Sequence, residues 1–154
     1  MAVETNGSYK SKLGTTGFGV EARKESIEST NLGNHERELL GIFLEQLISL
    51  GAKTDLRAGL YSNYYSEYGW KHFPGMELGF QASPALRFYS GVGSSYRIPT
   101  YTDLYYRGPT NIGNENLMPE QALSFEVGGK WAKNNWRGEL VYFCLLYTSD
   151  AADE

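Results

Sequence analysis

The chain has a single cysteine, Cys144, so no disulfide can form within it. It has no run of about 18 apolar residues, which excludes a transmembrane helix. It lacks His-Glu-x-x-His, Gly-x-Ser-x-Gly and P-loop signatures, so no enzymatic activity is expected. Its two histidines, His35 and His72, are far apart in sequence, so neither a metal site nor a cofactor is expected. No signal peptide is visible at the N-terminus, which for an exported protein implies truncation.

The chain is instead rich in glycine and tyrosine. There are 18 glycines among 154 residues, and the 12 tyrosines outnumber the 7 phenylalanines. The mean hydropathy is −0.43. This composition favours strands with one apolar face over helices, and it is compatible with a membrane barrel, whose strands expose apolar side chains on one face only.

Period-two alternation predicts the strands. In residues 53–63, Lys53, Asp55 and Arg57 alternate with apolar residues, so one face is charged and the other apolar. Residues 39–44 are apolar on both faces, so the facing of segment 36–50 stays unassigned and an amphipathic helix remains an alternative there. The predicted strands are residues 16–29, 36–50, 53–63, 76–82, 86–97 and 123–131.

The connections alternate in length. Tight turns are predicted at 50–53, 83–85 and 133–135, with longer loops at 67–70 and 98–118 between them. Short turns on one rim and long loops on the other are typical of an outer-membrane barrel. Aromatic residues cluster at the predicted strand ends, as in membrane-interface girdles: Tyr61, Tyr64, Tyr65, Tyr68, Trp70, Trp131 and Trp136.

Residues 96–120 read YRIPTYTDLYYRGPTNIGNENLMPE. This segment closely resembles a recurring one in TonB-dependent outer-membrane receptors, where an Arg-x-Pro-Thr turn ends a strand and Gly-Asn-x-Asn-Leu-x-Pro-Glu opens the next. The matching residues are Arg97, Pro99, Thr100, Asp103, Leu104, Tyr105, Tyr106, Gly113, Asn114, Asn116, Leu117, Pro119 and Glu120.

The resemblance implies an all-β fold of antiparallel strands from a transmembrane barrel. Residues 16–143 would supply six or seven of the roughly 22 strands of such receptors. Residues 1–15 are expected to be a poorly defined segment. Residues 144–154, CLLYTSDAADE, resemble a translated sequencing adapter and are expected to be an artefact rather than barrel.

The implied function is uptake of a scarce, large ligand, cobalamin or a ferric siderophore, across the bacterial outer membrane. The expected partners are the TonB complex, a plug domain, the ligand and outer-membrane lipid, with no nucleic acid. The signal peptide, energy-coupling box and plug are absent from this sequence. Two alternatives remain: a non-transporting binding or adhesin barrel, and a soluble all-β carbohydrate-binding module.

Two groups of candidate site residues follow from the resemblance. Tyr101, Tyr105, Tyr106 and Arg107 are expected to be exposed in the long loop and to contact ligand, because Tyr and Arg give large contact area at low ordering cost. Ten other motif residues are instead expected to shape the loop and its return strand: Arg97, Pro99, Asp103, Leu104, Gly113, Asn114, Asn116, Leu117, Pro119 and Glu120. A third set is expected to line the lumen, because charges are costly against lipid: Lys53, Asp55, Arg57, Glu77, Arg87, Arg97, Glu126 and Lys130.

Overall fold

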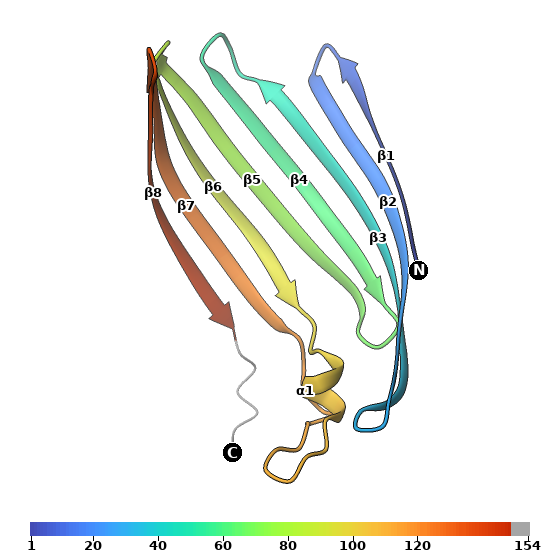
Figure 1. Ribbon diagram of the computed structural model, residues 1–154. Coiled ribbons are helices and arrows are strands. Elements are labelled where there is room, and N and C mark those ends of the chain that lie inside the picture. The colour runs from blue at the N-terminus through green and yellow to red at the C-terminus, as the bar shows by residue number, and fades with distance from the viewer. Residues whose placement is uncertain (149–154) are drawn as a thin grey trace.

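The computed structural model describes residues 1–148, which form one antiparallel sheet (Figure 1). Each strand pairs with the next one in the chain. The strands within these residues are β1 Ala2–Ser11, β2 Gly14–Ser29, β3 Gly33–Ser49, β4 Thr54–Tyr65, β5 Gly69–Ser83, β6 Leu86–Arg97, β7 Glu120–Lys133 and β8 Trp136–Thr148. One short helix, α1 Tyr101–Tyr105, lies between β6 and β7. No helix within residues 1–148 is long and apolar enough to cross a membrane.

The predicted alternation of connections is confirmed. The turns at 12–13, 50–53, 84–85 and 134–135 lie at one end of the strands, and residues 30–32, 66–68 and 98–119 lie at the other (Figure 1). Gly14 shows why a tight turn needs glycine. Its φ is +121°, and a Cβ there would overlap the carbonyl oxygen of Leu47.

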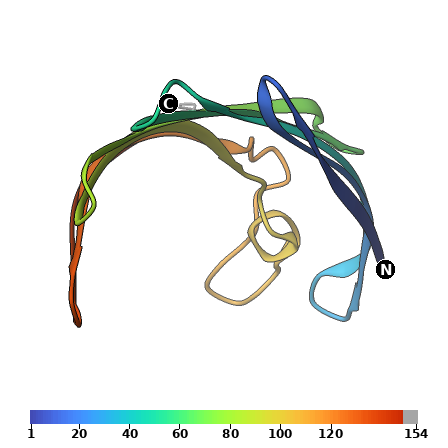
Figure 2. The ribbon, with the colours of Figure 1, turned by 90° about the horizontal axis from the view of Figure 1, so that it is seen from above.

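The sheet is curved, and α1 lies inside the curve (Figure 2). The face turned away from α1 carries a belt of large apolar side chains, each 38–57% exposed: Leu40, Ile42, Leu44, Leu60, Met76, Leu78, Phe80, Phe88, Val92, Leu123, Phe125 and Val127. Within residues 1–148, Tyr65 and Leu104 are the buried apolar side chains, so the sheet has no second layer. Such a belt needs an apolar surrounding, which disfavours the soluble module.

The concave face carries the charges, as predicted from alternation. Arg57 pairs in register with Glu77, and the Arg87 guanidinium lies 2.7 Å from the Asp55 carboxylate. Arg57, Glu77 and Glu126 border a hollow of about 850 Å³ on this face. Lys53 is an exception, since it lies in the turn before β4.

The N-terminal part of the prediction was wrong. Residues 1–15 are not a poorly defined segment, because β1 pairs with β2 along its whole length. Short polar residues and glycine make the alternation of β1 too weak to recognise in the sequence. With β1 and β8 added, the described residues hold eight strands rather than six or seven.

The facing of β3 is now assigned, and the helical alternative for 36–50 was wrong. β3 is extended throughout and pairs with β2 and β4. His35, Arg37 and Phe43 share the concave face, while Leu40 and Ile42 lie on the convex belt. The segment is apolar on both faces because Phe43 stacks on Tyr61 across the concave side, with ring centroids 5.3 Å apart.

The aromatic residues near the longer loops divide between the two faces. Tyr64 and Trp70 lie on the convex side, with ring centroids 5.6 Å apart. Tyr65 is instead 5% exposed and packs against Tyr96, which also contacts Phe73. Strict alternation from Phe88 and Val92 would put Tyr96 on the convex face, but its ring contacts lie on the concave one. The pairing of β5 with β6 ends at Gly75 and Gly93, beside Pro74, so the alternation of β6 is not maintained to its end.

Residues 144–154 divide at the edge of the described chain. Residues 144–148 continue β8 and pair with residues 121–125 of β7, while 149–154 lie outside the described residues. The pairing does not test whether this segment comes from an adapter. The edge of β7 offers backbone N–H and C=O groups that any extended sequence can pair with, so the adapter origin stays a prediction.

Candidate functional site

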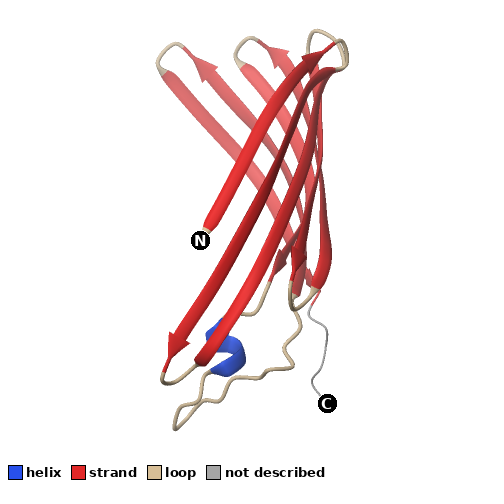
Figure 3. Cartoon of the chain, turned by 90° about the vertical axis from the view of Figure 1, so that its right-hand side faces the viewer, coloured by secondary structure: helices blue, strands red, loops and turns tan. Residues whose placement is uncertain are grey.

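The long connection between β6 and β7 begins with a capped helix. The Thr100 N–H donates to Asp103 Oδ2 at 2.9 Å, and the Asp103 N–H donates to Thr100 Oγ1 at 3.1 Å. This capping box fixes the start of α1, since it satisfies two backbone donors at once. The N–H and hydroxyl of Thr100 hold the pKa of Asp103 below its usual range. Figure 3 shows α1 close to the sheet at the loop end of the strands.

The returning half of the loop closes tightly over α1. The Gly113 N–H donates to the Tyr106 carbonyl at 2.6 Å, and the Asn114 N–H donates to the Asp103 carbonyl at 2.9 Å. Leu104 is 2% exposed beneath them. A Cβ on Gly113 would lie 2.6 Å from the backbone carbonyl carbon of Leu104. Only glycine fits this approach without moving backbone.

A turn built on Asn114 leads back to the sheet. Asn114 Oδ1 accepts from the Asn116 N–H at 3.0 Å, and the Asn114 carbonyl accepts from the Leu117 N–H at 3.2 Å. An asparagine side chain that accepts a hydrogen bond from the backbone N–H two residues later is typical of turns. Pro119 stands directly before β7, where its missing N–H leaves no ladder bond unmade.

The two ends of the loop meet at Arg97 and Glu120. They are register partners of β6 and β7, and Arg97 donates to the Glu120 carboxylate at 3.1 and 3.3 Å. Arg97 Nη1 also lies 3.9 Å from the Asp103 carboxylate. Both arginine contacts are exposed, so the pair adds little stability by itself. Its geometric effect is to close the base of the loop.

The four candidate ligand residues are not equally accessible. Tyr101, Tyr105 and Tyr106 are half-buried rather than exposed, because the loop folds back onto the sheet, whereas Arg107 is exposed. Tyr106 and Arg107 line a hollow of about 330 Å³ together with Glu115, whose carboxylate lies 3.7 Å from the Arg107 guanidinium.

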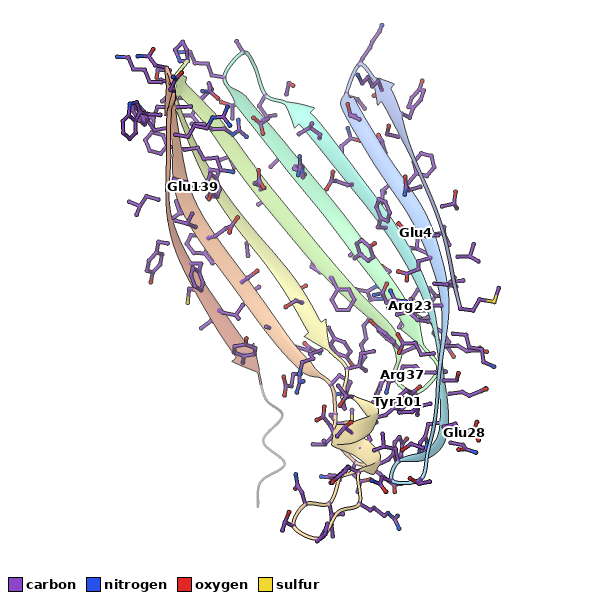
Figure 4. The ribbon with its side chains drawn as sticks, viewed as in Figure 1. Glu4, Arg23, Glu28, Arg37, Tyr101 and Glu139 are labelled. Carbon is purple, nitrogen blue, oxygen red and sulfur yellow. The ribbon has the colours of Figure 1, made fainter. Side chains whose placement is uncertain are left out.

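A residue that sequence reasoning missed, Arg37 of β3, lies beneath α1 and is 5% exposed. Its Nη2 lies 2.7 Å from a Glu67 carboxylate oxygen and donates to the Pro99 carbonyl at 3.2 Å. The guanidinium carbon is 5.0 Å from the ring centre of Tyr101 and 5.9 Å from that of Tyr68. Figure 4 shows Arg37 and Tyr101 close together where β3 approaches α1.

A second contact joins α1 to β3. The rings of His35 and Tyr105 are stacked with centroids 3.5 Å apart, and His35 Nε2 donates to the Leu32 carbonyl at 2.7 Å. Burial raises the pKa of both Tyr101 and Tyr105. These contacts depend on the register of β3 with β4, in which Ser49 pairs with Asp55, and no signal in the sequence fixed that register.

The arrangement is suited to contact rather than to reaction. Tyrosine rings, an exposed arginine and backbone turns surround small hollows at the loop end of the sheet. Within residues 1–148, no three His, Cys, Asp or Glu side chains come together in a way that could hold a metal ion. The loop presents an exposed arginine and half-buried tyrosine rings around these hollows.

Comparison with known proteins identifies a family that matches most of the chain. The family described as "TonB dependent receptor-like, beta-barrel" matches residues 3–149. A vitamin B12 transporter, BtuB, of Vibrio vulnificus is 30% identical over 107 residues, which are 70% of this chain and 17% of that protein. BtuB of Photobacterium profundum is 19% identical over 146 residues, 89% of this chain and 23% of that protein. The chain thus spans less than a quarter of the length of either relative.

Solved structures share the fold. The siderophore receptor PirA of Pseudomonas aeruginosa superposes with a TM-score of 0.80 at 22% identity, over 92% of this chain and 29% of that one. A ferric enterobactin receptor, PfeA, of the same organism gives a TM-score of 0.84 at 18% identity, over 95% of this chain and 26% of that one. At these identities the likeness concerns the arrangement of the strands.

Proposed function

Because the chain belongs to the TonB-dependent receptor-like β-barrel family, we propose that it is part of an active-transport receptor that takes up a scarce, large ligand with energy supplied by TonB. The sheet is part of the wall of a barrel in the bacterial outer membrane. The family consists of receptors and transporters rather than enzymes. The concave face is then the lumenal face, and the convex belt faces lipid.

The observation that carries the proposal is the position of the long loop. Residues 98–119 fold inward, so that α1 lies over the lumenal face at the end of the barrel that carries the longer loops. A ligand that approaches from this end meets Tyr106 and Arg107 before it reaches the charged wall below. In an outer-membrane barrel the longer loops are the extracellular ones.

The relatives suggest which ligands to test first. The relative at 30% identity is named for vitamin B12, and the structural neighbours are named for siderophores and enterobactin. We therefore take cobalamin as the first candidate and a ferric siderophore as the second. The charged lumenal wall, with both signs of charge, supports a plug domain as partner through ion pairs, and the TonB complex would act through that plug.

Replacing Arg107 or Tyr106 by Ala in the full-length receptor is expected to weaken ligand binding about five- to tenfold, the effect of removing one important contact residue. Both side chains line the hollow on the loop. The measurement is equilibrium binding of cyanocobalamin, and separately of ferric enterobactin, to receptor purified in detergent.

The matched control is Arg137→Ala, which removes an arginine at the opposite end of the sheet, where β7 pairs with β8. It is expected to leave affinity unchanged. Binding of either ligand that is insensitive to both loop substitutions would remove Tyr106 and Arg107 from the site. Failure of the purified receptor to bind either ligand would instead reject these two ligand classes.

A further inference from the structure

We propose that Arg37 is a positioning residue that holds α1 and its loop folded over the lumen, so that the ligand-facing surface is formed before ligand arrives. This inference rests on the proposed function for its purpose. Its physical basis is the contacts of one buried guanidinium with two segments that are distant from it in sequence, the turn that holds Glu67 and the entry to α1.

The first part of the argument is burial. The Arg37 side chain is 6% exposed, and burying an unpaired guanidinium would be costly. Glu67 supplies the compensating charge from the turn between β4 and β5, with Nε to Oε2 at 2.9 Å and Nη2 to Oε2 at 2.7 Å. The ion pair therefore connects the wall strand β3 to this neighbouring turn. Removing Glu67 would leave the arginine charge without its partner.

The second part is the geometry of the guanidinium. The N–H groups at its edge donate to the Glu67 carboxylate and to the Pro99 carbonyl. Its plane lies near the rings of Tyr101 and Tyr68. Pro99 and Tyr101 are the entry to α1, so the contacts fix where the helix begins. A lysine carries the charge but has neither the planar face nor the fork of donors. Arginine is therefore the residue type that can make all these contacts at once.

The third part is that α1 has little else to fix it on the side of β3. The helix is only five residues long and cannot be stable alone. Besides Arg37, the described contacts of α1 with β3 are made by His35 alone, whose ring stacks on Tyr105 with centroids 3.5 Å apart and on Tyr101 with centroids 6.0 Å apart. Loss of the Arg37 contacts should therefore free the entry to the helix and, with it, residues 98–119.

The test is a distance measurement between spin labels in the full-length receptor, without ligand, in a background free of other reactive cysteines. One label stands at Thr110 on the loop and the other at Asn31 in the turn between β2 and β3, both exposed. A second pair, at Asn31 and Ser49, spans β3 and reports on the wall alone. Electron–electron double resonance gives the distance distribution for each pair.

The unsubstituted receptor should give a narrow distribution for the loop pair. Arg37→Ala, Arg37→Lys and Glu67→Gln should each broaden it and shift it, with the wall pair unchanged. The matched control is Arg57→Ala on the same face, whose arginine is half exposed and 3.7 Å from Glu45. This control should leave both distributions as they were.

Two results would overturn the proposal: a loop distribution unchanged in both the Arg37 and Glu67 variants, or equal broadening of the loop and wall pairs. If Arg37→Ala does not assemble, Glu67→Gln decides, since Glu67 lies outside the strands. Because no ligand is present, this result is independent of the binding assays that test the proposed function.

Discussion

Gly113→Ala is expected to lower the affinity of the full-length receptor for its ligand about thirtyfold, corresponding to about 2 kcal/mol of strain in the closed loop. The added Cβ would lie 2.6 Å from the Leu104 carbonyl carbon and 2.8 Å from the Tyr105 nitrogen. Both are backbone atoms of α1 and its exit, so the loop must open to relieve the overlap. The strands do not take part in this contact, so membrane assembly should be normal.

The measurement is equilibrium binding of whichever probe binds the unsubstituted receptor, with heat-modifiable migration on gels as the assay of assembly. Gly138→Ala is the control glycine substitution, at the opposite end of the sheet from the loop. Its Cβ would meet no atom within 4 Å. Equal affinities for the two variants would contradict the close approach at Gly113.

Leu78→Arg is expected to destabilise the barrel by about 2–4 kcal/mol, the cost of an arginine on the lipid face near the middle of the membrane. Leu78 is 43% exposed on the convex belt, between Leu56 on β4 and Ser90 on β6. Its neighbour Glu77 points to the opposite, lumenal face. The two positions therefore compare the two faces at the same depth of one strand.

The measurement is reversible unfolding by guanidinium of the full-length receptor in lipid vesicles. Glu77→Arg introduces the same side chain into a face that already carries charges of both signs, so the change in unfolding free energy should be well below that of Leu78→Arg. A larger loss for Glu77→Arg would show that the faces have been assigned the wrong way round.

The strands were predictable where one face is apolar and the other charged. In β4 and β5, Asp55, Arg57 and Glu77 alternate with Leu56 and Leu78, and the register confirms both faces. β1 was missed because its side chains are mostly polar or absent on both faces. Local alternation cannot detect a strand whose partner alone keeps it extended.

The loop was predictable as a unit but not in its placement. The residues from Arg97 to Glu120 were predicted as one turn, loop and return strand. Apart from the bond that the Pro99 carbonyl accepts from Arg37, their described hydrogen bonds join residues of this same segment. The burial of Tyr101 and Tyr105 depends on His35 and Arg37, more than 60 residues earlier in the chain. Such contacts follow from the register of β3, β4 and β5, which the ambiguous facing of β3 concealed.

The central claim is that one face of this sheet lines a barrel lumen and the other faces lipid. Its most direct test is a scan of single spin labels at residues 76–82 of β5 in the full-length receptor in membranes. Accessibility to oxygen, which dissolves in lipid, should peak at Met76, Leu78 and Phe80, and accessibility to a water-soluble nickel chelate should peak at Glu77 and Gly79, with a period of two residues. Accessibility without alternation, or with the two reagents exchanged between the faces, would contradict the account.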